Sequence, residues 1–186
     1  MMVPIDSEII DSCRHGNTAA FRTVVQTYQP MLYSLAVKML ADQEEAKDIV
    51  QDTFIKAWQS MDSFDNRYSL STWLYTIASR LCIDRIRRLR FSEPMPDDIA
   101  VFHEYVSDDN PQRQLESREW VSVIKVLAGK LSNKQRLVFT LSQLEGLDSK
   151  EITQITGMDA NQIKANLSMA KKSIREQLIK LGYEKN

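Results

Sequence analysis

The sequence predicts an all-α protein made of two small helical domains, and three observations lead to this prediction. Only five glycines and five prolines occur in 186 residues, which is few for a turn-rich β protein. Apolar residues recur with helical spacing along much of the chain, and helix-capping residues precede several of these runs. Residues 93–116 hold seven acidic residues and one basic residue, whereas residues 117–186 hold 12 basic and 7 acidic residues. We therefore expect domains at 1–92 and 117–186, joined by an acidic linker at 93–116.

The first domain is predicted to be a series of helices. Asn17 can cap a helix over residues 18–28, and Pro30 is placed to open the next one, because proline is favoured in the first helical turn. Asp42, with Glu45 three residues later, resembles a capping box and begins an acidic helix. The buried stripe of that helix is predicted to comprise Ala46, Ile49, Val50, Thr53, Phe54, Ala57 and Trp58.

A loop over residues 62–71 leads to a helix that Ser71 caps and that continues to Arg90. Aromatic residues lie in and after the loop, and arginines follow along the helix. This combination suits single-stranded nucleic acid, because bases stack on aromatic rings and phosphates attract arginines. A core stripe with a solvated basic face would explain the helix equally well. The candidate residues are Phe64, Asp65, Asn66, Arg67, Tyr68, Trp73, Arg80, Asp84, Arg87 and Arg88.

The C-terminal domain contains three helix starts, each followed by a stop. A capping residue begins each helix and a glycine ends it, at Ser132 to Gly146, Asp148 to Gly157 and Asp159 to Gly182. The short second helix, the tight turn and the long third helix form a helix-turn-helix pattern. A three-helix bundle with a solvated polar face would show the same pattern. The residues expected to face DNA are Asn161, Gln162, Lys164, Asn166, Ser168, Lys171 and Lys172.

The acidic helix allows a third interpretation, because Glu44, Asp48 and Asp52 have the spacing of carboxylate metal ligands in helical bundles. Such sites normally add a Glu-x-x-His motif, and neither His15 nor His103 lies in one. A solvated face or a docking face is the better explanation. No metal, no cofactor and no catalytic motif is expected, so the chain is not predicted to be an enzyme.

The residue pattern resembles a known family. The sequence AKDIVQDTFIKAW fits the A-x-D-x-x-Q-x-x-F-x-x-A-W frame of region 2 in the sigma-70 family, in its extracytoplasmic-function (ECF) branch, and STWLYTIA at 71–78 continues that frame. The segment LSNKQRLVFTLSQLEGLDSKEITQITGM is similar to region 4 of the same family. Residues 159–166 depart from the arginine-containing pattern common there, which implies a different promoter sequence.

This resemblance implies an RNA polymerase sigma factor that binds core polymerase, selects promoters and assists strand opening. It implies partners at the β′ clamp helices and the β flap, and an anti-sigma factor as a further partner, for a chain that is monomeric when free. Residues 64–68 and the following helix would capture a base flipped out of the promoter. The alternatives are a stand-alone helix-turn-helix regulator and a helical adaptor that binds only protein. The residues expected to dock on polymerase are Asp48, Gln51, Asp52, Phe54 and Lys56.

The resemblance also gives the acidic linker a role. It places this segment in the basic channel that carries the transcript, whereas composition alone also fits an inert tether. The linker residues concerned are Asp97, Asp98, Glu104, Asp108 and Asp109.

Several features indicate the cytoplasm as the expected compartment. Cys13 and Cys82 lie far apart in the sequence, so buried reduced thiols are favoured over a disulfide. The N-terminus lacks a basic segment followed by a long apolar run, so no secretory signal is expected. No uninterrupted apolar stretch approaches the roughly 18 residues of a membrane span.

Overall fold

The computed structural model describes residues 5–92 and 131–180, and the described residues form helices and the turns between them. The N-terminal part comprises α1 (Ser7–Arg14), α2 (Thr18–Leu40), α3 (Gln43–Gln59), the short 3-10 helix η1 (Met61–Ser63) and α4 (Leu70–Ser92). The C-terminal part comprises α6 (Asn133–Phe139), the π-helical turn η3 (Thr140–Leu144), α7 (Ser149–Thr156) and α8 (Ala160–Lys180). The five acidic linker residues lie outside the described residues.

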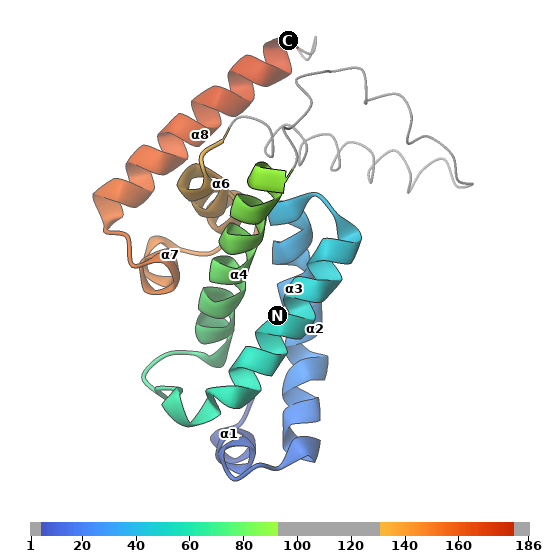
Figure 1. Ribbon diagram of the computed structural model, residues 1–186. Coiled ribbons are helices and arrows are strands. Elements are labelled where there is room, and N and C mark those ends of the chain that lie inside the picture. Colours follow the sequence, from blue (N-terminus) through green and yellow to red (C-terminus); the bar gives the residue numbers. More distant parts are fainter. Residues whose placement is uncertain (1–4, 93–130, 181–186) are drawn as a thin grey trace, which may run out of the picture.

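Helix α4 occupies the middle of the molecule, with α2 and α3 on one side and the C-terminal helices on the other (Figure 1). The side chains that α2, α3 and α4 direct toward one another include Leu32, Leu35, Ile49 and Leu74, each at most 1% exposed. Helix α1 packs across one end of these helices, where Cys13 is buried. The all-α class predicted from the sequence is confirmed for the described residues.

Local hydrogen bonds begin several helices where the sequence predicted them. The Asn17 side chain accepts from the amides of Ala19 and Ala20, and Asp42 caps α3 through the amides of Glu44 and Glu45. In the C-terminal part, the capping boxes at Ser132 and Asp148 are complete, and Gly157 ends α7 in the left-handed conformation with φ of +71°. These predictions are confirmed.

Two predicted boundaries in the N-terminal part are wrong. Pro30 lies inside the continuous helix α2 rather than at the start of a new helix. A proline in a helix interior costs about 3 kcal/mol, but burial of one large apolar side chain contributes about 1.5–3 kcal/mol. The stripe of α2 buries several such side chains on both sides of Pro30, among them Val24, Leu32 and Leu35. Burial of the whole stripe therefore outweighs the local cost of the proline.

The other boundary concerns α4, which begins at Leu70 and is capped by Ser69 rather than Ser71. The Ser69 hydroxyl accepts a hydrogen bond from the Thr72 amide at 3.1 Å, and the Ser69 carbonyl accepts from the Trp73 amide at 3.1 Å. The sequence offers serine at both positions, and the choice is settled by the buried side chain of Leu70, which has to point into the core.

The two helical parts pack directly against each other. Leu137, Val138 and Leu141 from the C-terminal part belong to the same buried cluster as Leu35 and Leu74. Helix α7 packs on α4, and its Ile152 and Ile155 side chains enter this cluster. The sequence predicted two helical domains joined by a linker and did not predict this contact.

A largely buried polar cluster around Glu145 reinforces the contact. The Glu145 carboxylate pairs with the Lys38 ammonium at 2.8 Å and accepts hydrogen bonds from the hydroxyls of Ser34 at 2.9 Å and Tyr75 at 3.1 Å. Burial, and secondarily the nearby carboxylate charge, raises the pKa of Tyr75 well above its ordinary range. Arg136 is also buried and donates to the Met39 carbonyl at 3.1 Å. We call Ser34, Lys38, Tyr75 and Glu145 the inter-domain cluster.

The two cysteines are free and buried, as the sequence favoured. Cys82 lies in α4 with no exposed surface, and burial raises the pKa of its thiol to about 12. Both thiols are therefore packing residues of the core.

Candidate nucleic-acid interface

The loop between η1 and α4 is a short turn organised by Asp65. The Asp65 carboxylate accepts from the Arg67 backbone amide at 3.0 Å and from the Arg67 Nε at 2.7 Å, and its backbone carbonyl accepts from the Tyr68 amide at 3.0 Å. The hydrogen bonds from Arg67 lower the pKa of the Asp65 carboxyl. Asn66, Arg67 and Tyr68 are exposed at the tip of this turn. The turn therefore presents an amide, a cation and an aromatic ring to solvent.

The Phe64 ring belongs to the core. It is 4% exposed and lies against the Trp73 ring, with the two centroids 5.1 Å apart. The sequence placed Phe64 among the residues that contact single-stranded DNA, but a ring with this little exposure has no open face on which a base could stack. Tyr68, at 45% exposure, and the partly buried Trp73 are the aromatic residues of this region that solvent reaches.

Helix α4 carries a row of exposed charged residues beyond the loop. Arg80, Asp84, Arg87 and Arg88 are all exposed, and Arg87 lies 3.7 Å from Asp84 in a solvated ion pair. Such pairs contribute little to stability, so Arg87 and Asp84 can exchange this pairing for one with a charged ligand. Arg85 points the other way and pairs with Glu45 of α3. Glu45 therefore serves the packing of α3 on α4 instead of closing the capping box that the sequence suggested.

The helix-turn-helix is formed by α7 and α8. Asp159 begins α8 with a reciprocal pair of bonds, in which the Gln162 amide donates to the Asp159 carboxylate at 2.8 Å and the Asp159 amide donates to the Gln162 side chain at 3.1 Å. Ile152 and Ile155 of α7 and Ile163 of α8 are buried in the same hydrophobic cluster. The outer face of α8 exposes Asn161, Gln162, Lys164, Ser168, Lys171 and Lys172.

Asn166 lies at the edge of this face. Its side chain is partly buried, and its amide nitrogen donates to the Gln162 backbone carbonyl at 2.8 Å. A base-reading role for Asn166 would require this bond to exchange for a bond to DNA.

The predicted docking residues on the acidic helix α3 differ in how far they are buried. Asp48, Gln51 and Lys56 are exposed and Asp52 is partly buried. Phe54 is 7% exposed and packs edge-on against Phe21, with centroids 6.2 Å apart, so it is a core residue of the kind the stripe of this helix predicts. The small exposed part of the Phe54 ring faces the apolar groove between α2 and α3, so its predicted docking role would be exercised through that groove.

An apolar groove runs beside this face, and the sequence did not indicate it. The groove has a volume of about 570 Å³ and lies between α2 and α3, with Phe21, Val25 and Trp58 in its wall and Gln51 and Ile55 along it. Ile55 is 45% exposed. An isoleucine outside the buried stripe of an acidic helix was the one signal in the sequence that could have pointed to this groove.

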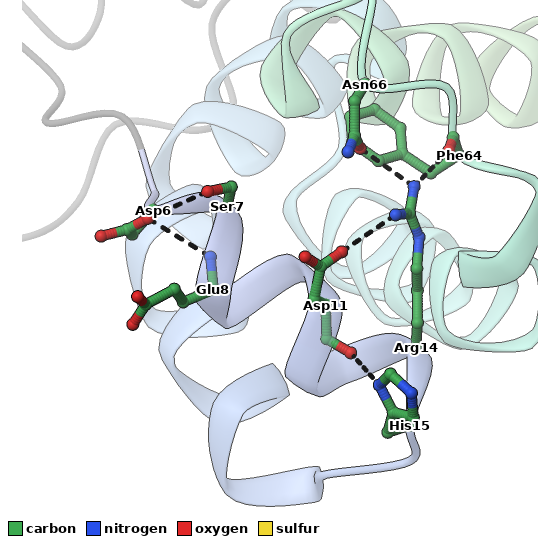
Figure 2. Close-up of polar contacts among 8 residues, drawn as sticks. All are labelled: Asp6, Ser7, Glu8, Asp11, Arg14, His15, Phe64 and Asn66. Carbon is green, nitrogen blue, oxygen red and sulfur yellow. Dashed lines mark hydrogen bonds and ion pairs between the residues drawn. The ribbon is translucent and has the colours of Figure 1, made fainter.

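Sequence reasoning also missed the contact between α1 and the loop. Arg14, at the end of α1, donates from Nη2 to the Phe64 carbonyl at 2.6 Å and to the Asn66 side-chain oxygen at 2.9 Å (Figure 2). The sequence assigned no helix before Asn17. The pattern SEIIDSCR, with Ile10 and Cys13 on one face, was the available signal.

The described residues give no support for a metal site. Among residues 5–92 and 131–180, no group of three or more His, Cys, Asp or Glu side chains is placed to hold an ion. Glu44 and Asp48 are exposed on the outer face of α3, and Asp52 is partly buried. In the same residues, no helix has both the length and the apolar character needed to cross a membrane.

Comparisons with known proteins agree with these two parts. Residues 24–91 match the family model for sigma-70 region 2, and residues 123–174 match the model for sigma-70 region 4. The chain is 32% identical over 176 residues to the ECF RNA polymerase sigma factor SigW of Bacillus subtilis, covering 91% of this chain and 94% of that protein. It is 26% identical over 180 residues to the RNA polymerase sigma-H factor of Pseudomonas aeruginosa, with 93% of each chain covered.

Solved structures with the same fold are also similar to this chain. The sigma factor RpoE of Bartonella quintana, solved with the anti-sigma factor NepR, has a TM-score of 0.64 and 28% identity, covering 85% of this chain and 96% of that one. CnrH, solved with the cytosolic domain of CnrY, has a TM-score of 0.66 and 23% identity, covering 91% and 94% of the two chains, a likeness that concerns the fold alone.

Proposed function

This chain belongs to the ECF branch of the sigma-70 family, and we propose that it acts as a sigma factor that binds core RNA polymerase, directs it to specific promoters and assists strand opening. One observation carries the proposal. A loop with an exposed amide, cation and aromatic ring precedes a basic helix face, and the same chain holds a helix-turn-helix with an exposed cationic face. Two nucleic-acid surfaces of different character in one chain suit recognition of two promoter elements.

We assign the loop tip at Asn66, Arg67 and Tyr68, with the half-buried Trp73, to capture of an unpaired base near the start site. A base that leaves the duplex loses its stacking partners, and an aromatic ring can restore about 1–3 kcal/mol per base. The exposed arginines Arg80, Arg87 and Arg88 lie farther along α4 and suit the phosphates of the same strand. Asp84 faces the same side, and it suits a cytosine amine rather than a phosphate.

We assign the exposed face of α8 to the upstream promoter element. Lys164, Lys171 and Lys172 can contact phosphates, while Asn161 and Gln162 at the start of the helix can contact base edges. This division follows the helix-turn-helix geometry, in which the N-terminal residues of the second helix enter the major groove.

The exposed residues Asp48, Gln51 and Lys56, together with the half-buried Asp52, are proposed to dock on the clamp helices of the β′ subunit. The neighbouring apolar groove gives this surface a non-polar centre with a polar rim, the usual anatomy of a protein interface. The proposed partners further include the β flap and an anti-sigma factor, since the RpoE of Bartonella quintana was solved with one. The cytoplasm is the proposed site of action.

The acidic residues at 97, 98, 104, 108 and 109 are proposed to lie in the basic channel of the polymerase and to compete there with nascent RNA. Replacing all five by Asn or Gln should weaken binding to core polymerase, more at low salt than at high salt, because salt screens the attraction. The yield of short abortive transcripts should also change. Unchanged affinity at low salt together with an unchanged abortive pattern would show that the linker is an inert tether.

The test of the proposed function is transcription with purified components. The protein is mixed with core RNA polymerase and a library of duplex DNA, and the transcript starts are sequenced. We expect starts that share two sequence elements and that require both the protein and the core enzyme. A stand-alone regulator would instead bind duplex DNA without the polymerase and produce no core-dependent starts.

A further inference from the structure

Arg14 connects α1 to the loop that carries Asn66, Arg67 and Tyr68, although 50 residues separate it from Phe64 in the sequence. Its Nη2 donates both to the Phe64 carbonyl, at 2.6 Å, and to the Asn66 Oδ1, at 2.9 Å (Figure 2). One guanidinium nitrogen therefore joins the first residue of the turn to a residue at its tip. The Phe64 ring lies beneath the same guanidinium, with its centroid 6.0 Å from the Arg14 Cζ.

Arg14 is itself held in place by α1. Its Nη1 donates to the Asp11 carboxylate at 3.0 Å, one turn earlier on the helix. Ile10 and Cys13 anchor the same helix in the core, at 9% and 2% exposure. The Asp6 side chain caps the start of the helix through the Glu8 amide. A helix with this much support gives the guanidinium a fixed position, so it can fix the loop in turn.

The contact determines which way the Asn66 amide faces. An arginine has donors and no acceptor, so the group of Asn66 that meets it must be the carbonyl oxygen. Asn66 is exposed, so its NH₂ group is left as the donor that an incoming base can reach. Such a donor pairs with a base edge that presents an acceptor and disfavours one that presents an amine.

We propose that Arg14 is a positioning residue for capture of the unpaired promoter base, and that it sets both the shape of the loop and the donor character of Asn66. This inference rests on the proposed function of the loop. A loop ordered before DNA arrives loses less conformational freedom on binding than a loose one, so the anchor increases affinity. By fixing the amide, it also increases discrimination among bases at the captured position.

The first measurement is hydrogen exchange on the free protein. The amides of Arg67 and Tyr68 report on the turn, because both donate to Asp65. In Arg14→Met these two amides should exchange at least about tenfold faster, because the turn loses both hydrogen bonds from the guanidinium. In Arg175→Met, which removes an exposed arginine on α8, they should exchange at the wild-type rate.

The second measurement is binding of holoenzyme to forked promoter DNA that contains only the downstream element, with each base in turn at the captured position. Arg14→Met should lose about tenfold in affinity for the preferred base, and the four bases should become more nearly equal. Affinity for core polymerase should remain within about twofold. Arg14→Lys should give an intermediate loss, because a single ammonium lacks the fork that spans both acceptors.

The outcomes separate this inference from the function on which it rests. Wild-type exchange and base preference in Arg14→Met would overturn the role of Arg14. If that variant fails to fold, wild-type behaviour of the folded Arg14→Lys variant would overturn the role equally. A protein with Asn66, Arg67 and Tyr68 all replaced by alanine tests the loop itself. If it opens promoters as well as wild type does, capture by this loop is refuted whatever Arg14 does.

Discussion

The inter-domain cluster and the acidic face of α3 both depend on carboxylates, but they use them in opposite surroundings. Glu145 has 8% of its side chain exposed and touches Ser34, Lys38 and Tyr75 on two other helices. Asp48 stands in solvent on the outer face of α3. The buried carboxylate has lost most of its water and depends on its protein partners. The exposed one keeps its contact with water, so it adds little desolvation cost to folding.

The difference in burial distinguishes residues that stabilise the fold from residues that bind a partner. Removing one partner of a buried ionic cluster leaves the others desolvated and unpaired, which is costly for the folded state. Removing an exposed charge changes stability little and changes binding to partners instead. Replacing a residue of the buried cluster should therefore lower the free energy of unfolding. Replacing an exposed charge should weaken binding to a partner and leave the free energy of unfolding nearly unchanged.

Glu145→Ala is expected to have the largest effect on stability. It leaves the Lys38 ammonium and the hydroxyls of Ser34 and Tyr75 without their shared acceptor, so the free energy of unfolding should fall by about 3 kcal/mol. Urea denaturation followed by circular dichroism measures this. Glu176→Ala is the matched control. Glu176 is exposed, and its carboxylate lies 4.0 Å from the Lys172 ammonium in a solvated ion pair that contributes little to stability. An equal loss in both variants would remove the distinction between buried and exposed carboxylates.

Asp48→Lys should show the reverse behaviour. Like charge placed against basic residues of a partner costs several kcal/mol, so binding to core polymerase should weaken by about 100-fold while the free energy of unfolding changes by less than about 0.5 kcal/mol. Fluorescence anisotropy of labelled protein titrated with core enzyme measures the affinity. Glu8→Lys makes the same charge change on α1 and should leave binding intact. A large loss of stability in Asp48→Lys would identify the residue as structural.

The exposed lysines of α8 extend the comparison to cations. Lys164→Ala and Lys171→Ala should each weaken binding to the upstream element by about five- to tenfold. Each should also reduce the slope of log affinity against log salt by about 0.9, because one phosphate contact is lost. Stability should not change. Lys180→Ala, at the far end of the same helix, is the control, and identical slopes for all three variants would mean that another face of α8 meets the DNA.

The features predicted from sequence are those that depend on near neighbours. The capping boxes at Ser132 and Asp148 need only a residue three positions away, so the pattern contains all the information. The exposed face of α8 follows from helical period alone. The Glu145 contacts join residues separated by 70 to 111 positions, and the Arg14 contact spans 50. Such contacts depend on how whole helices pack, which no local pattern encodes.

Packing between whole helices also explains the residues whose positions were predicted wrongly from the sequence. Pro30 carries a strong local signal for a helix start, but the long apolar stripe of α2 overrides it. Phe64 carries an aromatic ring that could face a ligand, yet this ring packs against the Trp73 ring in the core. Aromatic residue type alone does not distinguish the two roles, because a stacking surface and a packed core both favour these rings.

Tyr75→Phe is the mildest change at the inter-domain cluster, and it sharpens the comparison by removing one hydrogen bond without altering the shape of the core. Loss of the bond to Glu145 should lower the free energy of unfolding by about 1 kcal/mol at neutral pH. The pKa of Tyr75 is raised in the folded protein, mainly by burial, from an unfolded value of 10.0. Its neutral form is therefore favoured by folding, and the tyrosine is protonated in both states below that value.

The Tyr75 hydroxyl makes the free energy of unfolding depend on pH in the alkaline range. Above about pH 10 the unfolded chain loses the Tyr75 proton while the folded protein keeps it, so stability falls as the pH rises. In Tyr75→Phe this contribution is absent, and stability should decline less steeply between pH 9 and about pH 11. Tyr68→Phe is the matched control, because Tyr68 is 45% exposed and its removal should leave the free energy of unfolding at neutral pH unchanged. Parallel alkaline curves for wild type and Tyr75→Phe would mean that solvent reaches the hydroxyl and that the inter-domain cluster opens in solution.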